Sequence, residues 1–209
     1  MTETKIDGAF GPVTFHAAAH RPSPALTDME HLDAYLSEQG LELPPAYRQF
    51  LETHNGGKVA PNGFAYRYEP EAKEVLERVL DPEDEILAEP GSTLRYFHGF
   101  GSDVISDLLT FQKRVTPWGR PGLFGIASAE FGDAVVLDLA TGDGYGSVHY
   151  LTIQGVAELV EEEDEFVPLA FIAPSFEVFQ SGFFDFDEMM EGSQADRLQG
   201  FLDKLMGRA

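Results

Sequence analysis

The sequence predicts an α+β fold: a single domain with a mainly antiparallel central sheet of about five or six strands, an N-terminal helix pair and C-terminal helices packed on it. Two apolar stripes at helical spacing come first, within residues 27–40 and 44–54. Five short segments rich in aromatic and β-branched residues follow, bounded by glycine. Because a helix with one apolar face must bury it against another layer, we expect the strands to form the sheet that covers the helix pair.

Length and composition favour one compact domain over residues 1–209. The chain is 43% apolar, enough to bury on the order of 70% of its unfolded surface without a metal or disulfide. No apolar run approaches the roughly 20 residues that span a bilayer, and residues 1–5 lack a basic segment followed by an apolar core. We therefore expect a cytoplasmic protein. The absence of cysteine excludes thiol nucleophiles, thiolate metal sites and a disulfide framework.

The charge is strongly negative and unevenly distributed. Fourteen basic residues face 36 acidic ones, for a formal net charge of -22, and no Lys or Arg lies between Arg120 and Arg197 against sixteen acidic residues. A field of this sign repels nucleic-acid phosphates and anionic lipids and speeds encounter with basic partners. We therefore expect no nucleic acid or membrane partner and favour a basic protein. The same charge also serves solubility alone, because net charge by itself specifies no interface.

The N-terminal part predicts a loosely tethered lead-in and a first helix. Residues 1–23 mix glycine, proline, alanine and histidine, and Val13–Phe15 could add a short edge strand. Thr27 is expected to be the N-cap of this helix, and together with Glu30, three residues later, it would form a capping box. Gly40 ends this helix, and its inward face is supplied by Met29, Leu32 and Leu36.

The second helix has the clearest boundaries in the chain. Pro44 forces Leu43 to be extended, and a proline in the first turn of a helix loses no needed hydrogen bond. One buried stripe then recurs at i, i+3, i+4 and i+7, formed by Tyr47, Phe50, Leu51 and His54. Asn55-Gly56-Gly57 ends the helix with residues that tolerate positive φ.

The middle of the chain predicts the sheet. The expected strands are Phe64–Tyr68, Leu94–Phe100, Leu123–Ala127, Ala134–Ala140 and Ser147–Ile153. Ala134–Leu137 is nearly all apolar and suits a central strand, whereas Phe64–Tyr68 alternates like an edge or one-sided strand. The residues Thr141–Gly146 supply a hairpin turn, so the last two strands should pair directly.

Outside the sheet, we expect an insert and a C-terminal extension around a core of about residues 24–184. The acidic insert at 69–91 carries a short amphipathic helix through Val75, Leu76, Val79 and Leu80, followed by an acidic loop. Ser175 can cap a helix that bears Phe176, Phe179 and Phe183. In the extension at 185–209, Ser193 with Asp196 can cap a last helix that bears Leu198, Phe201, Leu202, Leu205 and Met206.

The segment from Leu43 to Gly57 resembles the L-P-x-x-Y-x-x-F-L-x-x-x-N-G-G signature of the SUKH superfamily, which includes fungal cell-wall synthesis regulators and many bacterial immunity proteins. A helix opening at Thr27-Asp28-Met29-Glu30 and an A-x-S-F-x-x-F helix at Ala173–Phe179 fit the same family. The insert and the tail after Phe184 depart from it. The structural signature residues are Leu43, Pro44, Tyr47, Phe50, Leu51, Asn55, Gly56, Gly57, Ser175, Phe176 and Phe179.

No set of residues predicts catalysis, a metal site or a cofactor. His16 and His20 lie four apart but have no acidic partner at the offset of a zinc helix. His54 is expected to cap or pack at the end of its helix. His98 and His149 fall on predicted strands and could approach one another across the sheet, which would be the start of an enzyme site.

The resemblance implies a non-enzymatic protein-binding module. We expect an immunity protein that neutralises a basic toxin, for example a nuclease; the alternative is a regulatory scaffold of the same superfamily, and an enzyme ranks last. Trp118, in a loop that looks exposed, is either an interface anchor or packed under that loop. The acidic residues expected to contact a basic partner as an ensemble are Asp84, Glu85, Glu161, Glu162, Glu163, Asp164 and Glu165.

Overall fold

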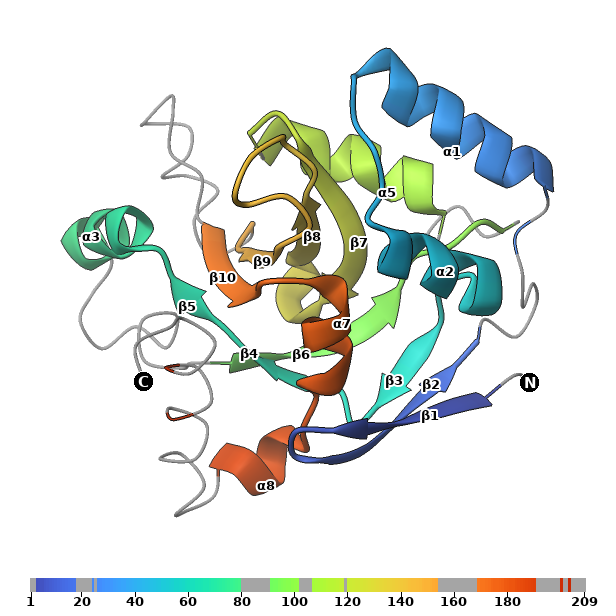
Figure 1. The fold of residues 1–209 in the computed structure, drawn as a ribbon. Coiled ribbons are helices and arrows are strands. Elements are labelled where there is room, and N and C mark those ends of the chain that lie inside the picture. The colour runs from blue at the N-terminus through green and yellow to red at the C-terminus, as the bar shows by residue number, and fades with distance from the viewer. Residues whose placement is uncertain are drawn as a thin grey trace.

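The computed structural model describes residues 3–17, 24, 26–79, 91–101, 107–118, 120–153, 169–190, 200 and 203. These residues form helices around a seven-stranded sheet, with a three-stranded sheet beside it (Figure 1). The strand pairs are all antiparallel in both sheets. The α+β class predicted from the sequence is therefore confirmed.

Residues 3–16 form strands rather than the loose lead-in that the sequence suggested, although the short strand it allowed at Val13–Phe15 is present, in the middle of the small sheet rather than at its edge. β1 (Glu3–Gly8) and β2 (Gly11–His16) form an antiparallel hairpin, and β2 pairs with β3 (Lys58–Ala60). Val13 and Phe15 of β2 are 0% and 2% exposed, respectively. The alternation that buries them is short and is flanked by small and polar residues, so the strand depends on its pairing rather than on its own pattern.

The helix pair is present, with one correction at its start. α1 (Leu26–Glu38) buries Met29, Leu32 and Leu36 as predicted. It begins one residue before Thr27, so this threonine lies inside the helix and is not its N-cap. An ion pair between Asp33 and Arg48 joins α1 to the second helix.

α2 (Pro45–His54) confirms the prediction for the second helix. The buried residues are Tyr47, Phe50, Leu51 and His54. Pro45 occupies the first turn, and Pro44 before it has ψ 137°, the extended conformation that stops the helix from starting earlier. Asn55 ends the helix in the left-handed conformation at φ 50° and ψ 49°.

The large sheet is almost closed on itself. Its order is β4-β6-β7-β8-β9-β10-β5, with β4 (Gly63–Ala65) and β5 (Arg67–Tyr68) at opposite edges. Only Tyr66 separates these two strands along the chain, so the segment predicted as one strand crosses from one edge of the sheet to the other (Figure 1). One short segment therefore supplies both edge strands of the sheet.

The remaining strands agree with the prediction except at their ends and at one omission. They are β6 (Gly91–Phe97), β7 (Leu123–Ala129), β8 (Ala134–Asp138), β9 (Val148–Leu151) and β10 (Leu169–Ala173). β8 and β9 pair directly, as the turn at Thr141–Gly146 predicted. The sequence analysis gave no strand at 169–173, because a five-residue apolar run has no periodicity to identify it.

Helices cover the sheet. They are α3 (Pro70–Val79), α5 (Leu108–Val115), α7 (Phe176–Ser181) and α8 (Phe186–Met190), with a single-turn 3₁₀ helix η1 (Thr116–Trp118). The short segment η2 (Glu130–Gly132) is a turn, because Phe131 within it is not helical. α3 was predicted inside the insert. The N-cap of α7 is Ser175, whose hydroxyl accepts from the Val178 N–H at 3.3 Å, as expected. The last predicted helix lies outside the described residues apart from Gly200 and Asp203, both in helical conformation.

α5 was not predicted, and it packs unusually close to the sheet. A Cβ atom on Gly125 of β7 would lie 2.9 Å from both Phe111 and Val115, so only glycine fits this contact. The Gln112 side chain accepts from the Gly125 N–H at 2.6 Å and donates to the Leu123 carbonyl at 3.0 Å. These two bonds satisfy backbone groups of β7 beside its irregular register at Gly125.

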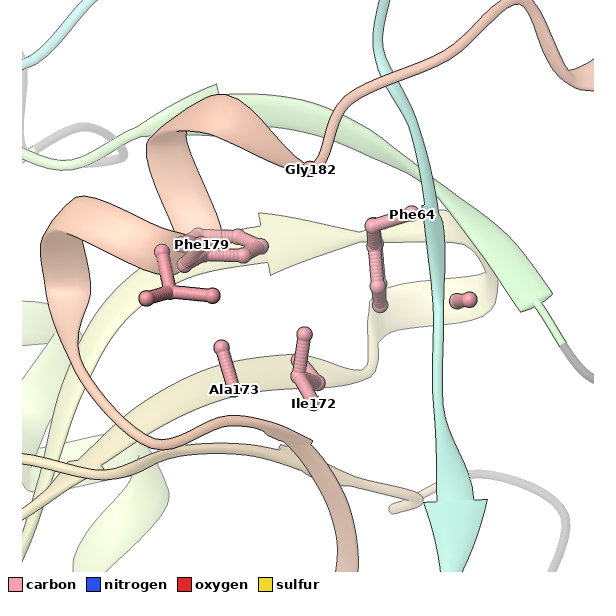
Figure 2. Close-up of a pocket in the computed structure, with 7 residues that line it drawn as sticks. Phe64, Ile172, Ala173, Phe179 and Gly182 are labelled. Carbon is pink, nitrogen blue, oxygen red and sulfur yellow. The ribbon is translucent and has the colours of Figure 1, made fainter. Parts of the chain in front are cut away.

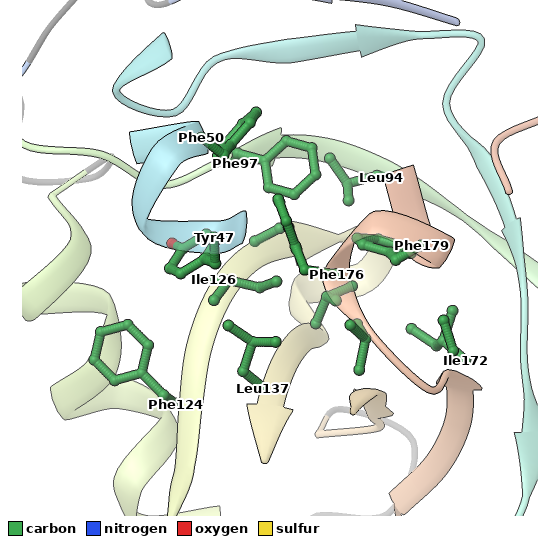
Figure 3. Close-up of a cluster of buried hydrophobic side chains, with 14 of the residues drawn as sticks. Tyr47, Phe50, Leu94, Phe97, Phe124, Ile126, Leu137, Ile172, Phe176 and Phe179 are labelled. Atoms are coloured by element: carbon green, nitrogen blue, oxygen red, sulfur yellow. The ribbon is translucent and has the colours of Figure 1, made fainter. Parts of the chain in front are cut away.

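The main core is aromatic and lies between the helices and the inner face of the large sheet (Figure 3). Phe50 of α2 lies 4.8 Å from Phe97 of β6 and 5.3 Å from Phe176 of α7, ring centre to ring centre. Tyr47 meets Phe176 edge to face at 5.0 Å. Aromatic residues of the two signature helices and the sheet therefore hold the fold together at one point.

Candidate functional site

The Asn55-Gly56-Gly57 end of α2 packs against the end of β6 and the residues after it, through hydrogen bonds to their backbone groups. The Asn55 side chain donates to the Phe100 carbonyl at 2.7 Å and accepts from the Phe100 N–H at 2.7 Å. Asn55 is 1% exposed, so both bonds are sheltered from water. One amide side chain therefore satisfies both backbone groups of a buried residue, as a paired strand would.

Two glycines make this docking sterically feasible. A Cβ atom on Gly56 would lie 2.6 Å from the Phe97 carbonyl oxygen, and one on Gly99 would lie 2.0 Å from the Asn55 carbonyl oxygen. Gly57 exchanges two hydrogen bonds with Phe97, at 3.0 and 2.7 Å. The signature therefore stabilises the joint between α2 and β6, and its Asn55 and Gly56 are buried rather than offered to a ligand.

His98 and His149 do not form a pair. His98 follows β6 and His149 lies on β9, and β7 and β8 separate these strands in the sheet, a spacing of about 14 Å for three strand intervals. His98 stacks on Phe111 at 3.7 Å and its Nε2 lies 2.8 Å from the Ser128 hydroxyl. The strand order, which the sequence does not give, overturns this pairing.

The surroundings of His149 also oppose a role as a catalytic base. Its Nε2 lies 2.8 Å from the Ser147 hydroxyl, but that hydroxyl donates to the Gly144 carbonyl at 2.6 Å, so the serine proton is already committed. Burial lowers the pKa of His149 to about 4, with a smaller opposing effect from Asp138. An imidazole with this pKa is a weak base at neutral pH.

One cavity lined by described residues is small and apolar (Figure 2). It measures about 10 Å³, room for about one water-sized sphere. Its lining comprises Phe64, Ala65, Ile172, Ala173, Val178, Phe179 and Gly182. A substrate pocket for a small molecule is typically about 300–1,000 Å³, so this cavity is a packing gap between α7 and the sheet.

Other kinds of site are also missing from the part of the chain that the structure describes. No group of three or more His, Asp or Glu side chains there is placed to hold a metal ion. No described helix is long and apolar enough to span a bilayer.

The surface of the described residues is mainly acidic. The exposed acidic residues are Glu3, Asp7, Glu30, Asp33, Glu38, Glu42, Glu52, Glu74, Glu77, Glu130, Asp143, Glu177, Asp185, Asp187 and Glu188. The exposed basic residues are Lys5, Lys58, Lys73, Arg95, Lys113, Arg114 and Arg120. The charge of the sequence is therefore carried on the outside, where it can act on a partner.

The structure places one of the predicted partner-binding residues. Trp118 lies in η1, is half-buried, and packs against the smaller apolar cluster that includes Phe111 and Val115. The predicted acidic contacts lie outside the described residues: Asp84, Glu85, Glu161, Glu162, Glu163, Asp164 and Glu165.

Two large apolar side chains are exposed among the described residues, and the sequence analysis singled out neither. Phe131 is 77% exposed in η2, and Tyr145 is 39% exposed in the turn between β8 and β9. The Tyr145 hydroxyl donates to the Glu42 carbonyl at 3.3 Å. A phenylalanine next to a glycine between two predicted strands was the available signal, but it does not distinguish a packed ring from an exposed one.

The SMI1 / KNR4 family (SUKH-1) model matches residues 27–182. The chain belongs to this family. The match runs from α1 to the end of α7, so it includes the α2 signature and the large sheet of this SUKH domain. No curated protein and no solved structure matches the chain.

Proposed function

We propose that this SUKH domain is a non-enzymatic binding module that neutralises a basic protein toxin in the cytoplasm, as an immunity protein. The observation that carries the proposal is the large excess of negative charge, -22 in 209 residues, in a chain whose resemblance to the SUKH superfamily implies toxin immunity. A nuclease is the toxin class that fits best, because a groove that binds phosphate presents Lys and Arg.

The mechanism is occlusion of the toxin by a rigid acidic surface. Opposite charge accelerates encounter, and specificity comes from shape and from a few anchoring side chains. The fold supports this mechanism because its helices and nearly closed sheet hold many of the exposed carboxylates on fixed elements, which limits the entropy lost on binding.

The absence of enzymatic activity is part of the proposal. It is supported by the separation of His98 from His149 and by the commitment of the Ser147 hydroxyl to the Gly144 carbonyl. The signature residues Asn55, Gly56 and Gly57 have a structural explanation, so they leave no polar group of this segment that awaits a substrate.

A regulatory scaffold is the second candidate. The matched family model carries the SMI1 / KNR4 name, and the superfamily that this chain resembles includes fungal cell-wall synthesis regulators. Such a scaffold would bind several cellular proteins rather than one toxin.

A growth experiment separates the two candidates. Each gene adjacent to the gene for this chain is expressed in a bacterial host with and without the SUKH domain. Immunity predicts that one neighbouring product stops growth and that co-expression of this chain restores it. A set of neighbours that are all harmless, together with copurification of several unrelated cellular proteins, contradicts immunity and supports the scaffold.

A further inference from the structure

The turn between β7 and β8 presents Phe131 to solvent. Phe131 is 77% exposed and belongs to none of the apolar clusters formed by the described residues. Single exposed apolar residues are common on protein surfaces, so exposure alone does not mark a binding site. The backbone of this turn supplies the second observation.

Phe131 stands in a backbone conformation that disfavours its side chain. It has φ 55° and ψ 8°, Gly132 follows with φ 89°, and the Asp133 N–H donates to the Glu130 carbonyl at 3.1 Å. These values describe a type I′ turn, in which both central residues need positive φ and asparagine or glycine is preferred. A bulky aromatic residue is therefore strained at the first central position.

The turn is held firmly beneath the exposed ring. The Ala129 N–H donates to the Asp133 carbonyl at 2.9 Å. The buried Asp133 carboxylate accepts from the Tyr150 hydroxyl at 2.5 Å and from the Ile153 N–H at 2.7 Å. A ring on such a fixed base loses little conformational freedom on binding. Strain and exposure together give the fold no benefit, which is typical of residues kept for function.

We propose that Phe131 is the anchor by which this domain seats in an apolar pocket of its protein partner, and that Lys or Arg side chains ring that pocket. The inference rests on the proposed function and names its contact point. Glu130, next to Phe131, is exposed. On the described surface as a whole, the exposed carboxylates outnumber the exposed bases, of which Arg95 on the neighbouring strand β6 is one. A rigid aromatic residue on a surface with this excess of carboxylates matches a basic partner in shape and in charge.

The test uses the full chain and the neighbouring gene product that copurifies with it. Phe131→Asn keeps a residue that the type I′ turn accepts, and Tyr145→Asn removes the other exposed aromatic residue as a matched control. We expect Phe131→Asn to weaken binding by about 30-fold or more, as a central anchor does, and Tyr145→Asn to change it by less than about threefold. The melting temperature of Phe131→Asn should be equal to that of the wild type or up to about 2 °C higher, because the backbone strain at position 131 is relieved.

Each other outcome overturns a stated part of the proposal. Unchanged affinity of Phe131→Asn removes the anchor but leaves the proposed function, since the domain still binds. Sedimentation that shows a wild-type dimer dissolved by Phe131→Asn assigns the residue to self-association instead. A lower melting temperature contradicts the strain argument. Failure of the wild-type chain to bind any neighbouring gene product refutes the proposed function itself, and the anchor with it.

Discussion

The Asn55 side chain should contribute more to stability than an ordinary surface amide, because it is the joint between α2 and the end of β6. Asn55→Ala removes two buried hydrogen bonds and leaves the Phe100 N–H and carbonyl without their partner. A buried polar group left unpaired costs about 1–3 kcal/mol. Alanine at φ 50° costs about 1 kcal/mol more than a residue that accepts this conformation. We therefore expect a loss of at least about 3 kcal/mol in the free energy of unfolding.

Two further variants divide this loss into its parts. Asn55→Gly removes the side chain but tolerates positive φ, so it should cost about 1 kcal/mol less than Asn55→Ala. Asn62→Ala is the matched control, because Asn62 also donates to a backbone carbonyl, that of Leu94 at 2.9 Å, but is exposed. Its cost should stay below about 1 kcal/mol.

Urea unfolding followed by circular dichroism measures all three variants. The midpoint should shift with an unchanged denaturant dependence, since the surface exposed on unfolding is the same. If Asn55→Ala costs no more than Asn62→Ala, the reasoning that makes the signature a structural joint is wrong.

Three other changes test the account of the core and the buried histidine. Folded His149 has a pKa of about 4 against 6.5 in the unfolded chain, so its contribution to the free energy of unfolding is present above about pH 6.5 and is lost as pH falls. Between about pH 7 and pH 5, the wild type should therefore lose about 2 kcal/mol more than His149→Gln in urea unfolding. Equal losses in the two proteins would contradict this pKa. Ser175→Ala removes the side-chain cap of α7 and should cost about 1 kcal/mol by thermal unfolding, whereas no change would mean that the cap contributes nothing. The Tyr47 hydroxyl is buried with no hydrogen-bond partner among the described residues, so Tyr47→Phe should be neutral or stabilise by about 1 kcal/mol; a clear destabilisation would show that the hydroxyl has a partner.

The sequence predicted those parts of the fold whose causes are local. Pro44 and Gly56 mark the two ends of α2 through backbone preferences that act within a few residues. The apolar stripe that includes Phe50 has the helical period. Ser175 likewise caps α7 through a bond to a residue three positions away. These elements could be found without knowledge of the rest of the chain.

The parts that were wrong or missing depend on contacts between distant segments. β1 is a strand because it pairs with β2, and its sequence from Glu3 to Gly8 contains one large apolar residue, Ile6. The distance between His98 and His149 follows from strand order, which no local pattern reports. α5 packs through the fit of its side chains onto Gly125, which becomes visible only when both elements are placed.

The candidate site shows the same division. Charge and its sign were readable from composition, and they suggested the kind of partner. The role proposed for Phe131 could not be predicted from the sequence, because it rests on a φ of 55° and on an exposed fraction of 77%. Both are properties of the folded turn.

The rate of association with the partner, measured as a function of ionic strength, tests the central claim most directly. For the full chain and its copurified neighbouring gene product, the account predicts that the association rate constant falls about tenfold or more between low and high salt, while the dissociation rate constant changes by less than about threefold. An association rate constant that does not change with salt would contradict recognition of a basic partner by this acidic surface.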